Sequence, residues 1–277
     1  MAKQKEHQAG SYKFFKPILL GMFNLYYSPK HENEEYLNVD GPIIVCGNHR
    51  HLFDQFMVIG STKRMLHYMA KKEYFDHKLK SIFFKAAGCI PVDRQNHGGN
   101  SKEIAIKVLN DGYALGIFPE GTRNNVATKE EKLIEVYKYL EDTISLKDYK
   151  KLAKTIGIQY TQTDLIIKLY NEKKIKLNEL KDYLLNPNKS LKKLVKKKII
   201  KQNEYEESLL IPLKFGTVSI AKKTNATIIP YAITGDYKFR SKNLKVTFAK
   251  PFKIDDMELE EANRKLYDSI ADILKDA

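Results

Sequence analysis

A histidine and an aspartate five residues apart form the pattern in this sequence with the clearest chemical meaning. His49 and Asp54 follow the apolar run 43–46, whose length and composition predict a buried strand that breaks at Gly47. If a helix begins near Asp54, one turn brings its carboxylate back to the imidazole. A carboxylate bonded to one ring nitrogen fixes the tautomer and leaves the other nitrogen free to accept a proton. The pattern therefore predicts a general base without a nucleophile of its own. The simpler alternative is a solvated histidine and a helix-capping aspartate.

A second pattern, Pro-Glu-Gly-Thr-Arg, directly follows the predicted strand 113–118. Such a turn offers backbone donors at Gly121, the hydroxyl of Thr122 and the guanidinium of Arg123, a set that can grip a phosphate. Glu120 is unusual in an anion-binding loop. We expect it to orient an arginine or to accept a hydrogen bond from a substrate hydroxyl.

The elements that must position these residues alternate between apolar strands and short helices, which predicts an α/β fold. After the first strand we expect strands at 65–70, 88–94, 113–118, 226–234 and 244–249. Helices are expected at 55–62, 81–87, 101–110 and 257–275, and residues 214–216 lead a further helix that runs through 220 to 223. The first strand delivers Asn48, His49 and Arg50 to its carboxyl end, where α/β proteins usually place their chemistry. Residues 28–41 are polar and predict a loop.

Residues 124–210 interrupt this alternation and predict a helical insertion with 19 basic and 13 acidic residues, a net charge of 19 − 13 = +6. Its helices are expected at 130–142, 146–155, 163–171, 176–185 and 189–200, with a break at 186–188. The basic amphipathic stretch 192–201 suits an acidic lipid or an acidic protein, although a solvated helix face is equally consistent with it. Residues 152–169 resemble a DNA-binding helix-turn-helix. Short matches of this kind are common in Lys- and Ile-rich helices, so we expect no nucleic acid as a partner.

The composition fits one catalytic domain with an insertion as well as it fits two domains. The 277 residues include 48 Lys and Arg against 34 Asp and Glu, and the net charge of +14 favours anionic partners. Both cysteines, Cys46 and Cys89, lie in apolar strand-like runs. This placement indicates core packing in a reducing compartment, not a disulfide framework or a metal site.

The beginning of the chain carries an apolar, aromatic segment, residues 11–27. It is short for a membrane span, and Pro17 and Gly21 interrupt it. Basic residues at one end and aromatic residues throughout favour a helix lying in the membrane interface. The alternative is an ordinary amphipathic helix packed on the domain. The polar residues that precede this segment show no secretory signal.

Four blocks of the sequence, in this order, resemble the glycerolipid acyltransferase family, and within it the 1-acylglycerol-3-phosphate acyltransferases. They are Asn48-His49-Arg50 with Asp54, the block Gly88–Arg94, the block Phe118–Arg123 (FPEGTR) and the block Ile228–Gly235. The resemblance covers about residues 11–123 and 212–277. Two features depart from the family pattern: His51 stands where a serine is usual, and the helical insertion separates the third and fourth blocks.

The resemblance implies a mixed central sheet flanked by helices, with an interfacial helix at 1–30, an acyltransferase domain in two parts at 31–123 and 211–277, and a helical insertion at 124–210. It implies acyl transfer from acyl-coenzyme A or an acyl carrier protein to lysophosphatidic acid, giving phosphatidic acid. His49 would be the base and Asp54 its orienter. By the same resemblance, the acceptor would be bound by Arg94, Glu120, Gly121, Thr122 and Arg123.

The same resemblance implies no metal and no cofactor, and a peripheral or monotopic place on the cytoplasmic face of the cell membrane, on anionic lipid. Three alternatives remain open at this stage. The acceptor could be glycerol 3-phosphate or another lysophospholipid. The chain could be a hydrolase, or a catalytically idle scaffold that keeps the fold.

Overall fold

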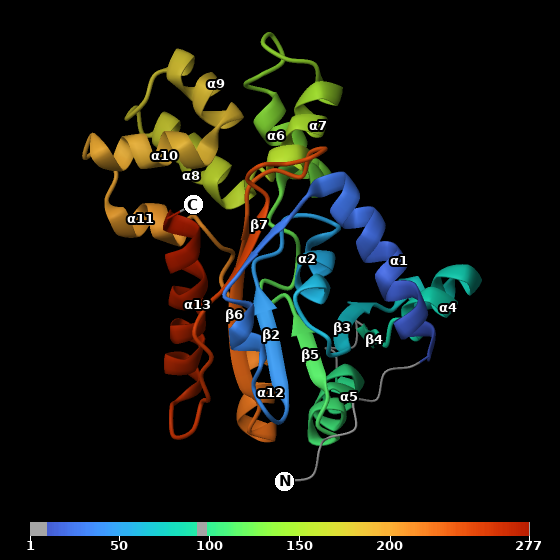
Figure 1. Ribbon diagram of the computed structural model, residues 1–277. Coiled ribbons are helices and arrows are strands. Elements are labelled where there is room, and N and C mark those ends of the chain that lie inside the picture. Colours follow the sequence, from blue (N-terminus) through green and yellow to red (C-terminus); the bar gives the residue numbers. More distant parts are fainter. Residues whose placement is uncertain (1–9, 93–98, 277) are drawn as a thin grey trace.

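A single sheet organises the computed structural model, which describes residues 10–92 and 99–276 (Figure 1). Its strands are β1 (Lys30–Glu32), β2 (Ile43–Gly47), β3 (Leu66–Lys71), β4 (Ile90–Val92), β5 (Ala114–Ile117), β6 (Thr227–Thr234) and β7 (Lys245–Phe248). They lie side by side in the order β1-β7-β6-β2-β5-β3-β4, and every neighbouring pair is parallel except β6 and β7. The predicted α/β class with a mixed central sheet is confirmed.

The two central strands are apolar along their whole length because helices cover both of their faces. Every residue of β2 and of β6 is buried. In β2, Ile44 and Cys46 belong to the buried cluster on one face, and Ile43 and Val45 belong to the cluster on the other. This is the continuous apolar pattern expected of strands buried on both sides.

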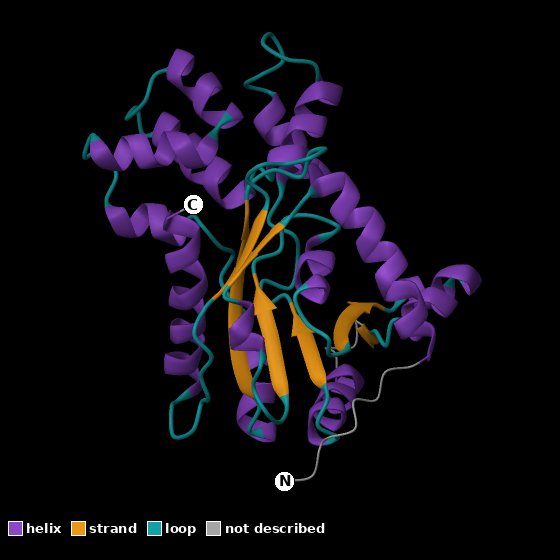
Figure 2. Cartoon of the chain, viewed as in Figure 1, coloured by secondary structure: helices purple, strands orange, loops and turns teal. Residues whose placement is uncertain are grey.

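Helices form a layer on each face of the sheet (Figures 1 and 2). One face packs against α5 (Gly99–Asn110), α12 (Gly216–Thr224) and α13 (Leu259–Asp276). The other packs against α2 (Asp54–Gly60), and α1 (Gly10–Tyr27) lies over α2. The remaining helices before β5 are the short helices η1 (Glu34–Leu37), α3 (Glu73–Asp76) and α4 (Lys78–Ala86). Both cysteines are free; Cys46 is buried, as the predicted core packing requires, and Cys89 is half-buried.

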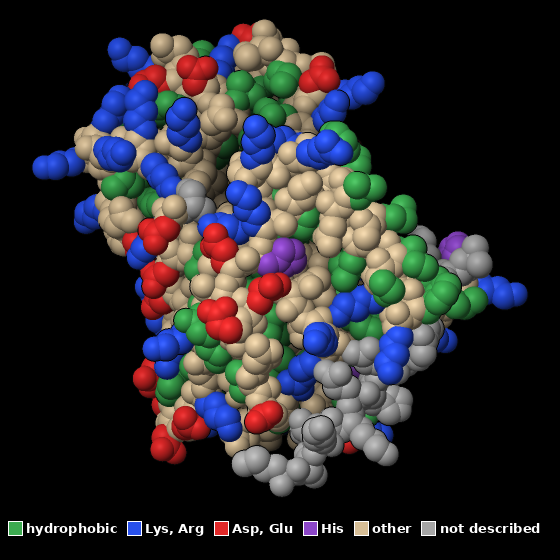
Figure 3. Space-filling view, viewed as in Figure 1, with side chains coloured by type: hydrophobic (Ala, Val, Ile, Leu, Met, Phe, Trp, Pro, Cys, Tyr) green, Lys and Arg blue, Asp and Glu red, His purple; other side chains and the backbone are tan. Residues whose placement is uncertain are grey.

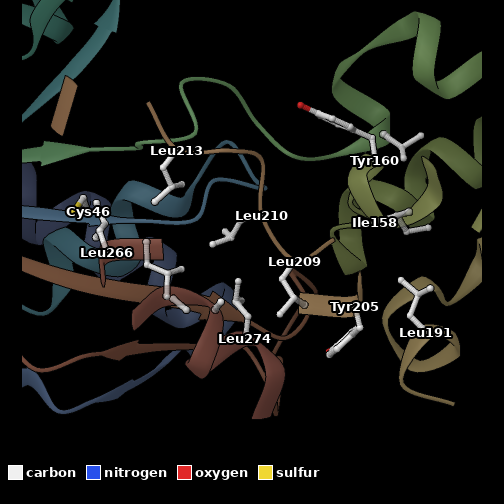
Figure 4. Close-up of a cluster of buried hydrophobic side chains, with 14 of the residues drawn as sticks. Cys46, Ile158, Tyr160, Leu191, Tyr205, Leu209, Leu210, Leu213, Leu266 and Leu274 are labelled. Carbon is white, nitrogen blue, oxygen red and sulfur yellow. The ribbon is translucent and has the colours of Figure 1, made fainter. Parts of the chain in front are cut away.

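Between β5 and α12 the chain, all of it described, forms only helices and loops. These helices are η2 (Val126–Thr128), α6 (Glu130–Tyr137), α7 (Leu146–Ile156), α8 (Tyr160–Asn171), α9 (Leu177–Leu185), α10 (Pro187–Lys196) and α11 (Gln202–Glu207). One continuous cluster of buried side chains runs from the sheet into them through Leu209, Leu210 and Leu213 (Figure 4). The insertion therefore shares its hydrophobic core with the sheet. The division into domains stays a prediction.

The structure differs from the sequence expectations mainly in short elements. Strand β1 lies inside the stretch predicted as a polar loop, because a three-residue edge strand buries too little to leave an apolar pattern. Helices α3 and α11 were not predicted, at four and six residues long. The predicted break at 186–188 is confined to Asn186, because Pro187 is the first residue of α10, a position where a missing N–H costs nothing.

Candidate active site

His49 and Asp54 are in contact, as their spacing predicted. His49 lies in the loop after β2, and Asp54 is the first residue of α2. The His49 Nδ1 and Asp54 Oδ2 atoms are 2.8 Å apart. The carboxylate is fully buried, whereas the imidazole is 18% exposed. The arrangement leaves Nε2 without a hydrogen-bond partner among the described residues, so this nitrogen is available to accept a proton.

The Asp54 carboxylate also organises the turn that carries His49. Its Oδ2 accepts the backbone N–H groups of Arg50 and His51, both at 2.7 Å. Its Oδ1 accepts the hydroxyl of Tyr237 at 2.6 Å. Burial alone would raise the pKa of Asp54, but the hydrogen bond and charge of His49, the His51 amide and the Tyr237 hydroxyl hold the pKa below its usual value. Asp54 is therefore a carboxylate at neutral pH and can stabilise a positively charged imidazole.

Other groups of this turn, one side chain and two backbone carbonyls, are bonded to distant segments. The Asn48 side chain bridges the N–H and C=O groups of Ile233 in β6, at 2.7 and 3.0 Å. The carbonyl of His49 accepts the Asn124 N–H at 2.6 Å, and the carbonyl of Arg50 accepts the Asn125 side chain at 3.0 Å. The turn is thus fixed by β6 and by the first residues of the insertion.

Two aromatic stacks set the planes of the histidine rings. His49 stacks on Phe118, with ring centroids 3.8 Å apart and an angle of 13° between the planes. His51 stacks in the same way on Tyr237, at 3.9 Å and 16°. Burial lowers the pKa of His51 to about 4, so this ring is neutral at physiological pH. His51 thus supports the tyrosine that bonds Asp54.

Glu120 lies behind the turn 48–51, which carries His49, and does not line the cavity. It is 2% exposed, and its two oxygens accept the backbone N–H groups of His49 at 2.7 Å and Ile211 at 2.9 Å. Burial raises its pKa to about 8. The carboxyl group thereby joins the turn 48–51 to the end of the insertion. It pairs with none of the described arginines, and its contact with a substrate hydroxyl stays a prediction.

A largely apolar cavity of about 440 Å³ opens beside His49. Its walls come from α1, α2, β3 and the α3–α4 region, with Phe118, Thr122 and Arg123 near the histidine. Gly121 takes the left-handed conformation (φ +71°), and a β-carbon there would lie 2.6 Å from the Lys214 side chain. Of the 119–123 turn, Thr122 and Arg123 line this cavity, whereas Glu120 and Gly121 do not. Their predicted contact with the acceptor stays a prediction. Arg94 lies outside the described residues.

Tyr237 is the site residue that sequence reasoning missed. It follows β6 in the segment Thr234-Gly235-Asp236-Tyr237, at the same edge of the sheet as His49. Burial raises the pKa of its phenol well above the usual range, so the hydroxyl stays protonated and donates to Asp54. Its position after the carboxyl end of a buried strand was the available signal.

No group of three or more His, Cys, Asp and Glu side chains that could hold a metal ion occurs among the described residues. The expectation that the reaction needs neither a metal nor a cofactor stays a prediction.

Comparisons with known proteins place the chain in a family. The 1-acyl-sn-glycerol-3-phosphate acyltransferase of Bacillus subtilis (strain 168) is 36% identical over 115 residues, which make up 41% of this chain and 58% of that protein. The protein of the same name from Streptococcus pneumoniae (strain ATCC BAA-255 / R6) is 28% identical over 97 residues, covering 34% of this chain and 37% of that protein. The matched regions therefore span about a third to just over half of these relatives' lengths.

A solved structure and a family model extend the match. The crystal structure of the 1-acyl-sn-glycerophosphate acyltransferase PlsC from Thermotoga maritima superimposes with a TM-score of 0.57 over the whole of this chain and 83% of that one. At 14% identity, this likeness shows that the fold is shared. The sequence model of the Acyltransferase family matches residues 28–234, a range that contains the His49–Asp54 pair, the 119–123 turn and β6. The chain belongs to the Acyltransferase family.

Proposed function

We propose that this protein transfers a fatty acyl group from a thioester to the free hydroxyl of 1-acyl-glycerol-3-phosphate, giving phosphatidic acid. The observation that carries the proposal is the His49–Asp54 pair beside an apolar cavity that also contains Thr122 and Arg123. The acceptor combines a hydroxyl, a long acyl chain and a phosphate. The site offers a base for the hydroxyl, an apolar cavity for the acyl chain and a cation for the phosphate. The related proteins from Bacillus subtilis and Streptococcus pneumoniae carry this activity in their names.

In the proposed reaction, His49 Nε2 takes the proton of the acceptor hydroxyl as its oxygen attacks the thioester carbonyl. Asp54 keeps Nδ1–H in place and stabilises the imidazolium that forms. As the tetrahedral intermediate collapses, the new ester forms, the C–S bond breaks and the imidazolium returns the proton to the leaving thiolate. The acceptor oxygen is the nucleophile, so the enzyme supplies none.

The acceptor phosphate is assigned to Arg123 and Thr122. Arg123 forms no ion pair with the described residues, and Thr122 lines the same cavity as His49. A guanidinium and a hydroxyl on one turn suit a phosphate monoester, because the guanidinium can bind two phosphate oxygens at once. This preference for a phosphorylated acceptor is what favours transfer over hydrolysis by water. Arg94 remains a candidate for the same role by resemblance.

Helix α1 supports a place on the membrane surface. Phe14, Phe15, Ile18, Met22, Leu25 and Tyr26 are exposed along one side of the helix, and Met22 and Leu25 are 67% and 72% exposed. Figure 3 shows apolar side chains gathered over this part of the molecule. Leu19 and Leu20 of the same helix line the cavity, so a chain entering from lipid would meet the cavity wall directly. None of the described helices is apolar and long enough to span a bilayer.

Acyl transfer by the purified protein and its His49→Ala variant, with lysophosphatidic acid and a long-chain acyl thioester, tests the proposal. Loss of a general base costs about 10²- to 10⁴-fold in rate. His77→Ala, an exposed histidine after α3, is the matched control and should keep full activity. Equal rates in the wild type and His49→Ala would contradict the role of His49 as the general base. If product forms with glycerol 3-phosphate and not with lysophosphatidic acid, glycerol 3-phosphate is the acceptor. If fatty acid is released without any acceptor, the protein is a hydrolase. Repeating the assay with acyl-coenzyme A and with an acyl carrier protein identifies the donor.

A further inference from the structure

A second cavity of about 270 Å³ lies between the insertion and the catalytic part of the chain, and shares no lining residue with the cavity beside His49. Its walls come from the α7–α8 connection, the start of α10, the end of β6 and the Arg50 side chain. Figure 3 shows the surface hollowed at the junction of these two parts. This cavity could not be predicted from the sequence, because its two sides are far apart along the chain.

Arg50 places a buried positive charge on the wall of this second cavity. The residue is 9% exposed, and it forms no ion pair with the described residues. Its Nη2 group donates to the Gly235 carbonyl, while its Nε–H is buried without a hydrogen-bond partner. The carboxyl end of α7 lies against the guanidinium, since a β-carbon on Gly157 would be 2.9 Å from Arg50 Cζ. The partial negative charge of that helix end offsets only part of the cost of burying a full charge.

The start of α10 contributes further donors to the same cavity. Asn186, Pro187, Asn188 and Lys189 all line it. No side chain caps this ten-residue helix and Pro187 has no N–H, so the first-turn donors without a partner within the helix or from a cap are the N–H groups of Asn188 and Lys189. Uncapped N–H groups and the positive end of the helix dipole attract anions. Lys189 adds a second side-chain cation at this end.

The acidic side chain in the cavity wall is paired with groups outside the cavity. Asp236 lines the cavity, and its Oδ2 accepts Lys238 Nζ at 3.0 Å and Asn243 Nδ2 at 3.2 Å. Asp236 is the one carboxylate among the lining residues, and it forms no ion pair with the two lining cations, Arg50 and Lys189. From these features we propose that this cavity is a binding site for the phosphate group of a small molecule, held by the Arg50 guanidinium, Lys189 and the first turn of α10.

This proposal does not rest on the reaction proposed above, because it can be tested without turnover. The probe is pyrophosphate, titrated calorimetrically into the full-length protein at low salt. We expect saturable binding that falls about tenfold to a hundredfold in Arg50→Gln, the range for losing hydrogen bonds to a charged group. Lys189→Gln should weaken binding several-fold. Lys196→Gln, which removes an exposed charge from the last turn of the same helix, should leave binding unchanged.

Arg123→Gln separates the two cavities, because it alters only the site beside His49. Pyrophosphate binding that survives Arg123→Gln and is weakened by Lys189→Gln supports the proposal. Absence of binding, loss of binding in Arg123→Gln, or equal binding by the wild type and both cavity variants would overturn it. Arg50→Gln removes a bond to Gly235, so Lys189→Gln keeps the test valid if Arg50→Gln does not fold. Competition by coenzyme A would identify the phosphate as that of the acyl donor. Binding that coenzyme A does not displace would identify a separate phosphorylated molecule.

Discussion

Replacing Tyr237 by phenylalanine removes one hydroxyl from the interior and tests how Asp54 is held. The Tyr237 hydroxyl is 2.6 Å from Asp54 Oδ1, and the three other bonds to this carboxylate all go to Oδ2. Phenylalanine keeps the ring that stacks on His51, so the loss is confined to a buried, charge-assisted hydrogen bond. Such bonds contribute about 1.5–3 kcal/mol. This is a large part of the roughly 5–15 kcal/mol that stabilises a typical domain.

We expect Tyr237→Phe to lower the free energy of unfolding by about 1.5–3 kcal/mol at pH 7.5, measured by urea denaturation followed by circular dichroism. The folded-state pKa of Asp54 lies below its unfolded value, so its contribution to stability is present at neutral pH and is lost as the pH falls through the folded pKa. Removing the hydroxyl raises that pKa. The acid-induced loss of stability should therefore begin at a higher pH in the variant.

Tyr149→Phe provides the matched control for this prediction. The Tyr149 hydroxyl in α7 is also buried, but it has no hydrogen-bond partner among the described residues. Its removal costs no hydrogen bond and should leave the free energy of unfolding unchanged or higher. A Tyr237→Phe variant within about 0.5 kcal/mol of the wild type, which is the usual range for a neutral surface change, would refute the reasoning.

Three further perturbations test other parts of the structure. The pKa of Glu120 is raised to about 8, so the free energy of unfolding should fall as the pH rises from about 4.5 to 8, by up to about 1.4 kcal/mol per pH unit. Urea denaturation of Glu120→Gln over the same range should not show this fall. The pKa of His51 is lowered to about 4, so the unfolded chain takes up a proton first and the wild type should lose stability as the pH falls from about 6.5 toward 4. Urea denaturation of His51→Phe should show a smaller loss over the same range. Leu25→Asp on α1 should reduce sedimentation with anionic vesicles at least several-fold, and Leu177→Asp on α9, 49% exposed, should not. Unchanged vesicle binding by Leu25→Asp would exclude α1 as the membrane contact.

The sequence was most informative where a burial pattern and a chemical pattern coincide. The strand 43–46 and the spacing of His49 and Asp54 together predicted both the fold position and the contact, because strand ends and helix starts constrain side chains locally. The same local reasoning placed Thr122 and Arg123 after β5, and both line the cavity that His49 lines.

Contacts between distant segments could not be predicted in this way. Nothing in the residues near Glu120 indicates that its carboxyl group would bond the amides of His49 and Ile211, because the second partner lies beyond the whole insertion. The bond from Tyr237 to Asp54 has the same origin, since it depends on β6 lying next to β2. Such pairings follow from sheet order, which a single sequence does not specify.

The bond between Asn48 and Ile233 joins residues 185 positions apart, and this separation has a consequence for how the protein is made. At about 5–20 residues per second, a ribosome needs roughly 10–40 seconds to synthesise the intervening chain. Once β5 has been made, β2 has β5 on one side but still lacks β6 on the other, so a fully apolar strand edge is left open. Folding of the turn 48–51 is therefore a late event with high contact order. Fragments that end before β6 should aggregate and should not retain partial activity.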